Sequence, residues 1–176
     1  MGIFRRRAMV VGLAALCLLG PAAAGAQPSA QMSGQVLAEA KSVVLKGETT
    51  RVALAAGAQA AGLQRRLADV VRRGAVYLVL DDLRAAEAPS VVYEIFLGLP
   101  AGAAPKPDDP HYVGTLNFFA VAPPNTQRRS RSYEVTPIVA RLSQGGGDLA
   151  VTVVGRGASA EMATPPSIGS VALVTQ

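Results

Sequence analysis

The sequence predicts a mainly β protein, an antiparallel β-sandwich or jelly-roll-like barrel with one or two short helices. About seven short runs rich in β-branched and aromatic residues are separated by glycine and proline turns, which is typical of such folds. One segment instead carries apolar residues at the three- and four-residue spacing of a helix, and a second has the capping residues of a helix start. The 176 residues are enough for a single domain.

The N-terminus has the pattern of an export signal. Three arginines at 5–7 precede an apolar run over residues 8–19, which is too short for a stable membrane anchor. The small residues at 24–26 form a site that a signal peptidase can cut. We therefore predict a signal peptide over residues 1–26 and a periplasmic or secreted protein.

Three variants of this interpretation exist. The arginines loosely resemble a twin-arginine export signal, but Phe4 replaces the usual polar residue before them. Cys17 suggests a lipoprotein, yet Leu16 occupies the position where a small residue is required. A retained signal anchor is the third variant. After the leader, residues 27–40 lack any sustained period and are expected to be a flexible linker, followed by one domain over residues 41–176.

Charge and cysteine content limit the possible functions. The whole chain carries a formal charge of +5, but three of its 17 basic residues belong to the leader, so the remaining 14 exceed the 12 acidic residues by only two. A nucleic-acid-binding surface is poorly supported by so small an excess. Because Cys17 is the only cysteine, the domain has no disulfide and depends on its apolar core.

The first half of the domain contains two strand candidates and a helix candidate. Residues 42–45 and 50–54 are β-rich, and the turn-like sequence at 46–48 predicts a hairpin between them. Residues 59–73 place Leu63, Leu67, Val70 and Val71 on one helical face, and Gly74 ends the helix. We expect this face to pack on the protein's own sheet, although an amphipathic helix can also bind a partner.

The remaining strands are predicted from apolar runs and alternation. Residues 76–80 are continuously apolar, as in a strand buried on both faces, whereas 91–97 should place Tyr93, Ile95 and Leu97 on one face. In 113–120, Leu116 and Phe118 share a face. Further strands are expected at 149–154 and 168–174. Between these groups, Thr136 and Pro137 suit the start of a short helix over 136–142.

No constellation of catalytic or metal-binding residues is present in the sequence. His111 is the only histidine, so neither a catalytic triad nor a zinc or copper site can be assembled by normal ligand counts, and we expect no cofactor. The pairs Asp81–Asp82 and Asp108–Asp109 are expected to be turn residues, with calcium-tolerant loops as the alternative. Adjacent carboxylates on a strand should point to opposite faces, which disfavours an acid/base couple.

Six sequence blocks, taken in order, resemble a known domain. The blocks are residues 76–83 (VYLVLDDL), 92–100 (VYEIFLGLP), 111–119 (HYVGTLNFF), 133–138 (YEVTPI), 148–154 (DLAVTVV) and 166–173 (PSIGSVAL). Together they resemble the C-terminal domain that follows the copper domain in bacterial tyrosinases and plant polyphenol oxidases. The resemblance spans residues 41–174, although no single block is diagnostic.

The resemblance implies a β-sandwich that covers the entrance of a type-3 copper site and helps to keep a proenzyme latent. The helical bundle with six copper-binding histidines is missing here, so oxidase activity of this chain alone is not expected. The resemblance instead suggests a binding or chaperone-like partner of a separate tyrosinase-type copper enzyme. We expect the contact in the loop of residues 105–112, at Asp108, Asp109, His111 and Tyr112, with His111 and Tyr112 at the tip; the alternative is that these residues only tuck the loop against the sandwich.

Two other function classes remain open at this stage. The domain can be a stand-alone extracytoplasmic β-sandwich that binds a ligand, a glycan or the cell envelope, with the resemblance reflecting fold alone. Against a glycan site, the sequence has no tryptophan and few other aromatic residues. A hydrolase is the third class, and it would need His111 as its catalytic imidazole.

Overall fold

A computed structural model describes residues 34–56, 62–87, 89–119, 121, 128–145, 147–157 and 164–176. The predicted signal peptide lies outside these ranges, as does the first part of the predicted linker. Residues Met32–Gln176 form one compact unit, to which all of the described residues belong.

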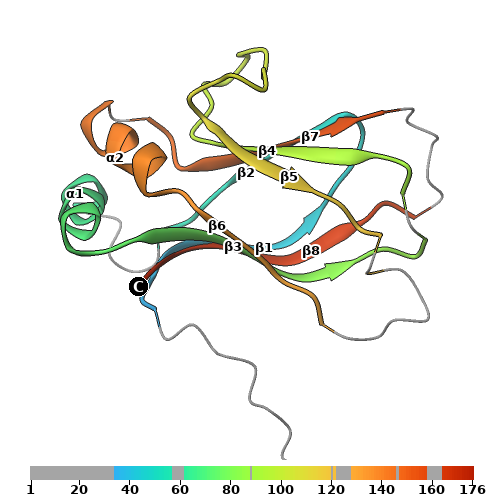
Figure 1. The fold of residues 1–176 in the computed structure, drawn as a ribbon, viewed down its shortest axis with the longest axis horizontal. Helices are drawn as coiled ribbons and strands as arrows, with labels where there is room; N and C mark the ends of the chain where they lie inside the picture. Colours follow the sequence, from blue (N-terminus) through green and yellow to red (C-terminus); the bar gives the residue numbers. More distant parts are fainter. Residues whose placement is uncertain are drawn as a thin grey trace, which may run out of the picture. The chain divides into compact units, whose positions relative to one another are not determined.

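The domain is a β-sandwich of two four-stranded antiparallel sheets, which confirms the predicted fold class (Figure 1). Sheet A has the order β1 (Val36–Val44), β8 (Ser167–Thr175), β3 (Val76–Arg84) and β6 (Arg131–Glu134). Sheet B has the order β2 (Thr49–Ala53), β7 (Ala150–Arg156), β4 (Val92–Leu97) and β5 (Tyr112–Leu116). At the edges of the sheets, the Tyr133 hydroxyl of β6 donates to the Thr115 carbonyl of β5 at 2.6 Å.

Strands that follow each other in the chain lie mostly in opposite sheets. β1 pairs with β8 and β2 pairs with β7, so the turn at 46–48 crosses from one sheet to the other and the predicted hairpin is wrong. The turn is closed locally, because the Lys46 amide donates to the Thr50 hydroxyl at 3.1 Å. Among the described strands, only β4 and β5 are both consecutive and paired.

Two helices connect the sheets at one end of the sandwich (Figure 1). They are α1 (Leu63–Arg73) and α2 (Thr136–Gly145). α1 ends at Gly74 as predicted, and the predicted stripe faces inward, with Leu67 fully buried. The helix packs chiefly against α2 and not on a sheet, which corrects the expected partner. The Thr136 hydroxyl accepts the Val76 amide at 2.9 Å and so joins the start of α2 to β3.

Two segments differ from their predicted secondary structure. Residues 36–40 belong to β1, so the domain begins within the segment predicted as a linker. β6 was not predicted as one of the separate strands, because its sequence, Arg-Ser-Tyr-Glu, has no apolar alternation and only Tyr133 is half-buried. It is a strand because its backbone pairs with β3 at the edge of sheet A.

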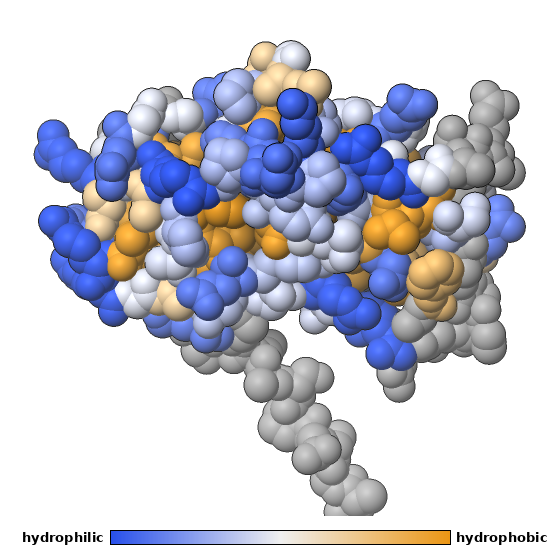
Figure 2. All heavy atoms as spheres, turned by 45° about the horizontal axis from the view of Figure 1, so that its top comes forward, coloured by the Kyte–Doolittle hydropathy of each residue, from blue (hydrophilic) through white to orange (hydrophobic). Residues whose placement is uncertain are grey.

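The surface is predominantly hydrophilic. In the view of Figure 2, blue and pale side chains cover most of the described atoms, and hydrophobic atoms reach the surface in separate small areas. The large hydrophobic side chains exposed among the described residues are Val36, Val44, Val92 and Phe119. Phe119 is the most exposed of these four, at 62%.

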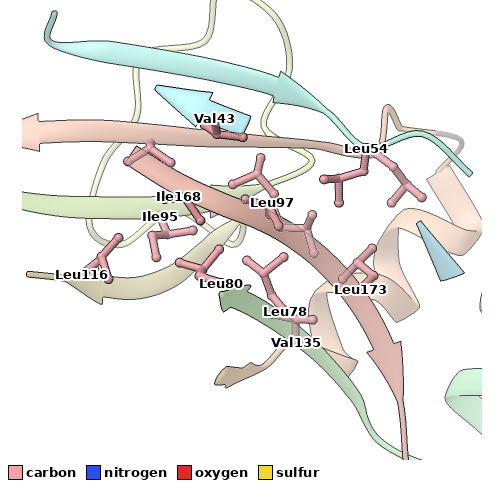
Figure 3. Packing of buried hydrophobic residues seen from close by; sticks show 14 of the residues in the cluster. Val43, Leu54, Leu78, Leu80, Ile95, Leu97, Leu116, Val135, Ile168 and Leu173 are labelled. Carbon is pink, nitrogen blue, oxygen red and sulfur yellow. The ribbon is translucent and has the colours of Figure 1, made fainter. Parts of the chain in front are cut away.

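The core lies between the two sheets, where side chains from both layers point toward one another (Figure 3). Val76, Leu78 and Leu80 of β3 are fully buried, whereas Tyr77 and Val79 between them are half-buried. β3 is therefore buried mainly on one face, which corrects the expectation of burial on both. The predicted alternation in β4 is confirmed, because Tyr93, Ile95 and Leu97 all belong to this core.

Candidate partner-binding site

The connection between β4 and β5, residues 98–111, folds over the outer face of sheet B; we call it the strap. A second apolar cluster forms beneath it, separate from the main core, from Phe96, Leu99 and Val154 with half-buried Tyr112 at its edge. The rings of Phe96 and Tyr112 meet edge to face with centroids 5.5 Å apart. In Figure 1 the strap rises above sheet B, on the side away from sheet A.

Three arginines from three different elements bind main-chain carbonyls of the strap. Arg51 of β2 donates to the Leu99 carbonyl, and Arg141 of α2 donates to the Pro110 carbonyl. Arg156 of β7 donates to the Pro105 carbonyl at 3.0 Å while its Nε donates to Glu94 at 2.9 Å. The strap is thus attached to the sandwich near both ends and in its middle.

The predicted contact residues are used mainly to hold the strap in place. The His111 Nδ1 and the Leu97 carbonyl lie 2.9 Å apart, and the Leu97 amide donates to the His111 carbonyl at 2.9 Å. The Asp109 carboxylate accepts the His111 amide at 2.8 Å. His111 and Tyr112 therefore lie at the base of the loop and not at its tip, which corrects their expected place. Of the four predicted residues, Asp108 alone is exposed.

Phe119 is a further candidate contact residue, which was not among those predicted from the sequence. Its neighbour Phe118 is fully buried and meets Tyr93 edge to face at 5.6 Å, which fixes the backbone just before Phe119. The Val121 amide donates to the Phe118 carbonyl at 3.0 Å and closes a turn around Phe119. β5 ends at Leu116, before the end of the strand predicted over 113–120, and Phe119 lies in the turn that follows. In the predicted strand the residue after Phe118 points to the opposite face, and this was the available signal.

The outer face of sheet A carries Asp81 and Asp82 side by side. Both lie inside β3, so the expectation that they are turn residues is wrong. Both also face outward, because Asp82 has φ 55°, so the expectation that adjacent carboxylates point to opposite faces is wrong as well. Arg128 pairs with Asp81 at 2.9 Å, and Arg84 pairs with Asp82 at 2.7 Å. The hydrogen bond from Arg84 lowers the pKa of Asp82, so this carboxylate stays ionised and is unsuited to act as a general acid.

Among the residues that the structure describes, no group of three or more His, Cys, Asp or Glu side chains is arranged to hold a metal ion. Neither described helix has the length and apolar character needed to cross a membrane.

Comparison with known families identifies the domain. Residues 32–176 match the family described as a domain of unknown function, DUF7868. The chain belongs to this family. The match begins before β1 and includes the eight strands that the structure describes. A search of curated proteins finds no match to the chain.

The DUF7868 domain is also similar to part of several solved polyphenol oxidases. Recombinant latent aurone synthase, a polyphenol oxidase crystallised with hexatungstotellurate(VI), matches at 18% identity and TM-score 0.46, over 76% of this chain and 25% of that one. Latent apple tyrosinase matches at 12% identity and TM-score 0.41, again over 76% and 25%. The chain therefore spans about a quarter of each enzyme. Polyphenol oxidases and tyrosinases are also the proteins that the sequence blocks resemble.

Proposed function

We propose that this DUF7868 domain is a non-catalytic binding partner of a separate tyrosinase-type copper enzyme, and that Phe119 makes the central contact. The exposed Phe119 side chain carries the proposal, because Phe96 and Phe118 are fully buried while Phe119 is 62% exposed. Aromatic side chains, phenylalanine among them, are enriched in protein interfaces, and a few central side chains supply most of the binding energy. The resemblance of the ordered sequence blocks to the tyrosinase C-terminal domain supports the choice of partner.

The strap supplies a second contact in this proposal. Asp108 is exposed on the strap, whereas the bonds of Asp109 and His111 are directed into the strap and its base. A contact by this loop would therefore use Asp108 and the exposed residues before it. Asp108→Ala should weaken binding only if the strap touches the partner.

Co-purification from the native host followed by titration of the isolated enzyme tests the proposal. We expect a histidine-rich copper oxidase to copurify, and added domain to lower its activity in a saturable way. Phe119→Ser should weaken the effect at least about tenfold, as for an interface anchor. Val92→Ser is the matched control, because Val92 is an exposed apolar residue, at 38%, on β4. A domain that neither copurifies with such an oxidase nor affects one would exclude this function, and saturable binding in a glycan screen would favour the stand-alone alternative.

Export is part of the same proposal, because the arginines at 5–7 and the apolar run over residues 8–19 have the pattern of a signal peptide. N-terminal sequencing of the protein from its host tests this directly. We expect the exported form to begin at Gln27, after the small residues at 24–26. A protein that starts at Met1 and remains in the cytoplasm would contradict it.

A further inference from the structure

The strap is held to the sandwich by few apolar side chains of its own. Leu99 is buried at its start, but residues 101–104 and 106–108 are exposed and Pro105 is only half-buried. Apart from the His111–Leu97 bonds at its base, the attachments described above go from guanidinium groups to main-chain carbonyls. Segments with little apolar burial and solvent-exposed hydrogen bonds are those that open locally while the rest of a protein stays folded.

The surface beneath the strap is buried, and mostly apolar, at positions that usually face water. In β7, Val151 and Val153 point into the main core, so Thr152 and Val154 point outward, yet these two are only 4% exposed. Phe96 of β4 also points outward and is 0% exposed. An outward face of an antiparallel sheet is normally polar. An apolar outer face is tolerated here because the strap shields it from water.

The middle of the strap depends on one bond among those described. Arg51 and Arg141 bind carbonyls near its two ends, whereas the Pro105 carbonyl is bound by Arg156. Arg156 uses Nη2 for this bond and Nε for Glu94, whose side chain is 14% exposed. A lysine at this position can keep the charge pair with Glu94, but it lacks the fork that binds both acceptors at once.

We propose that the strap opens and closes as a unit while the sandwich stays folded, and that the hydrogen bond between Arg156 and the Pro105 carbonyl holds it closed. In the open state Phe96 and Val154 reach solvent, and the domain gains an apolar surface that the closed state conceals. The inference does not depend on the proposed partner, since it concerns the domain alone.

Thiol labelling tests the proposal with the full chain. Cys17→Ser removes the only natural thiol, after which Val154→Cys reports opening of the strap and Val171→Cys, at a position 1% exposed in the main core, reports opening of sheet A. We expect Cys introduced at 154 to react much faster than Cys introduced at 171. Arg156→Lys should accelerate labelling at 154 about tenfold, as expected for loss of one charge-assisted hydrogen bond, and leave labelling at 171 unchanged.

Arg84→Lys is the matched control, because Arg84 also pairs with a carboxylate, Asp82, but lies on the outer face of the other sheet.

Amide exchange gives a second measurement without cysteines. In Arg156→Lys, the amides of Asp109 and Tyr112, which are bonded within the strap region, should exchange faster than those of β3 and β8. Equal labelling rates at 154 and 171, or equal effects of Arg156→Lys and Arg84→Lys at 154, would overturn the proposal.

Discussion

Ser42 and Asp82 are non-glycine residues inside strands that nevertheless have φ 55°. Both flank Gly169 of β8, since Lys41 and Asp81 pair with Ser170, and Val43 and Leu83 pair with Ile168. In β1, β3 and β8, two successive residues therefore lie on the outer face at the same level, and the strands stay in register because all three share this break in the alternation. A positive φ in a non-glycine residue costs free energy, which the surrounding sheet must offset.

Gly169→Ala should destabilise the domain. A Cβ at this position would lie 2.7 Å from the Cβ of Asp82, so strand β3 has to shift. We expect the free energy of unfolding to fall by about 1–3 kcal/mol, as for overpacking in a closely packed site. Urea denaturation gives the value. Gly145→Ala is the control, because nothing lies within 4 Å of its added Cβ, and a loss equal to that of Gly169→Ala would contradict the argument.

Tyr133 joins the edges of the two sheets through one hydrogen bond. Its hydroxyl donates to the Thr115 carbonyl, and its ring lies against Gly114, where an added Cβ would come within 3.0 Å of the ring. Tyr133→Phe should keep the ring contact and lose the bond, at a cost of about 1 kcal/mol in unfolding free energy. A variant as stable as the wild type in the same urea titration would show that the bond contributes nothing.

Tyr133 should also affect how the stability of the domain changes at alkaline pH. Burial raises the pKa of Tyr133, and of Tyr93, above the ordinary value of 10.0. The folded state then retains phenolic protons that the unfolded state releases, so the stabilising effect is complete below about pH 10 and is lost as the pH rises through the folded pKa. Urea midpoints measured from about pH 8 to about pH 11 should fall at the alkaline end. The fall should be smaller in Tyr133→Phe.

At the scale of whole elements, α1 is stabilised by its packing on α2. Leu67 is fully buried, whereas Leu63 on the same stripe is half-buried. Leu67→Ala should reduce the unfolding free energy by about 2–4 kcal/mol, because it removes a buried side chain and leaves a cavity between the helices. Leu63→Ala is the matched control and should cost clearly less. If both variants lost the same unfolding free energy in thermal or urea denaturation, the buried Leu67 side chain would contribute no more to stability than the half-buried Leu63.

Periodicity predicted most of the elements but not how they pair. Local alternation identifies which side of β4 is buried, because successive strand residues point to opposite faces. It cannot identify the partner strand, and the turn at 46–48 shows the consequence: two neighbouring strands joined by a good turn sequence belong to different sheets. β6 escaped prediction because its strand conformation depends on β3 and not on its own side chains.

The candidate site was predictable only in part, for a related reason. The sequence indicated the strap as a proline-rich loop, but its attachment depends on Arg51, Arg141 and Arg156, which come from distant parts of the chain. Their acceptors are main-chain carbonyls, which leave no signature in the loop sequence. Phe119 was visible as the outward residue of a predicted strand, yet its exposure is known only once the neighbouring elements are placed.

In the molecule as a whole, the last strand of the chain holds the middle of sheet A. β8 pairs with β1 on one side and with β3 on the other, and Ile168, Val171 and Leu173 are buried in the main core. The chain end is bound as well, because the Gln176 amide donates to the Ala75 carbonyl at 3.1 Å. Sheet A therefore cannot close until the final residues are present, so the domain should fold as one unit.

Two deletions should consequently have opposite effects. Removing residues 1–31 leaves the compact unit Met32–Gln176 complete, and the product should unfold in a single transition with the urea midpoint of the full chain. Removing residues 167–176 takes away β8, separates β1 from β3 and exposes the core between the sheets, so no cooperative transition should remain. Circular dichroism during urea titration distinguishes the two, and a cooperative transition in the shorter C-terminal variant would show that sheet B and the helices fold without sheet A.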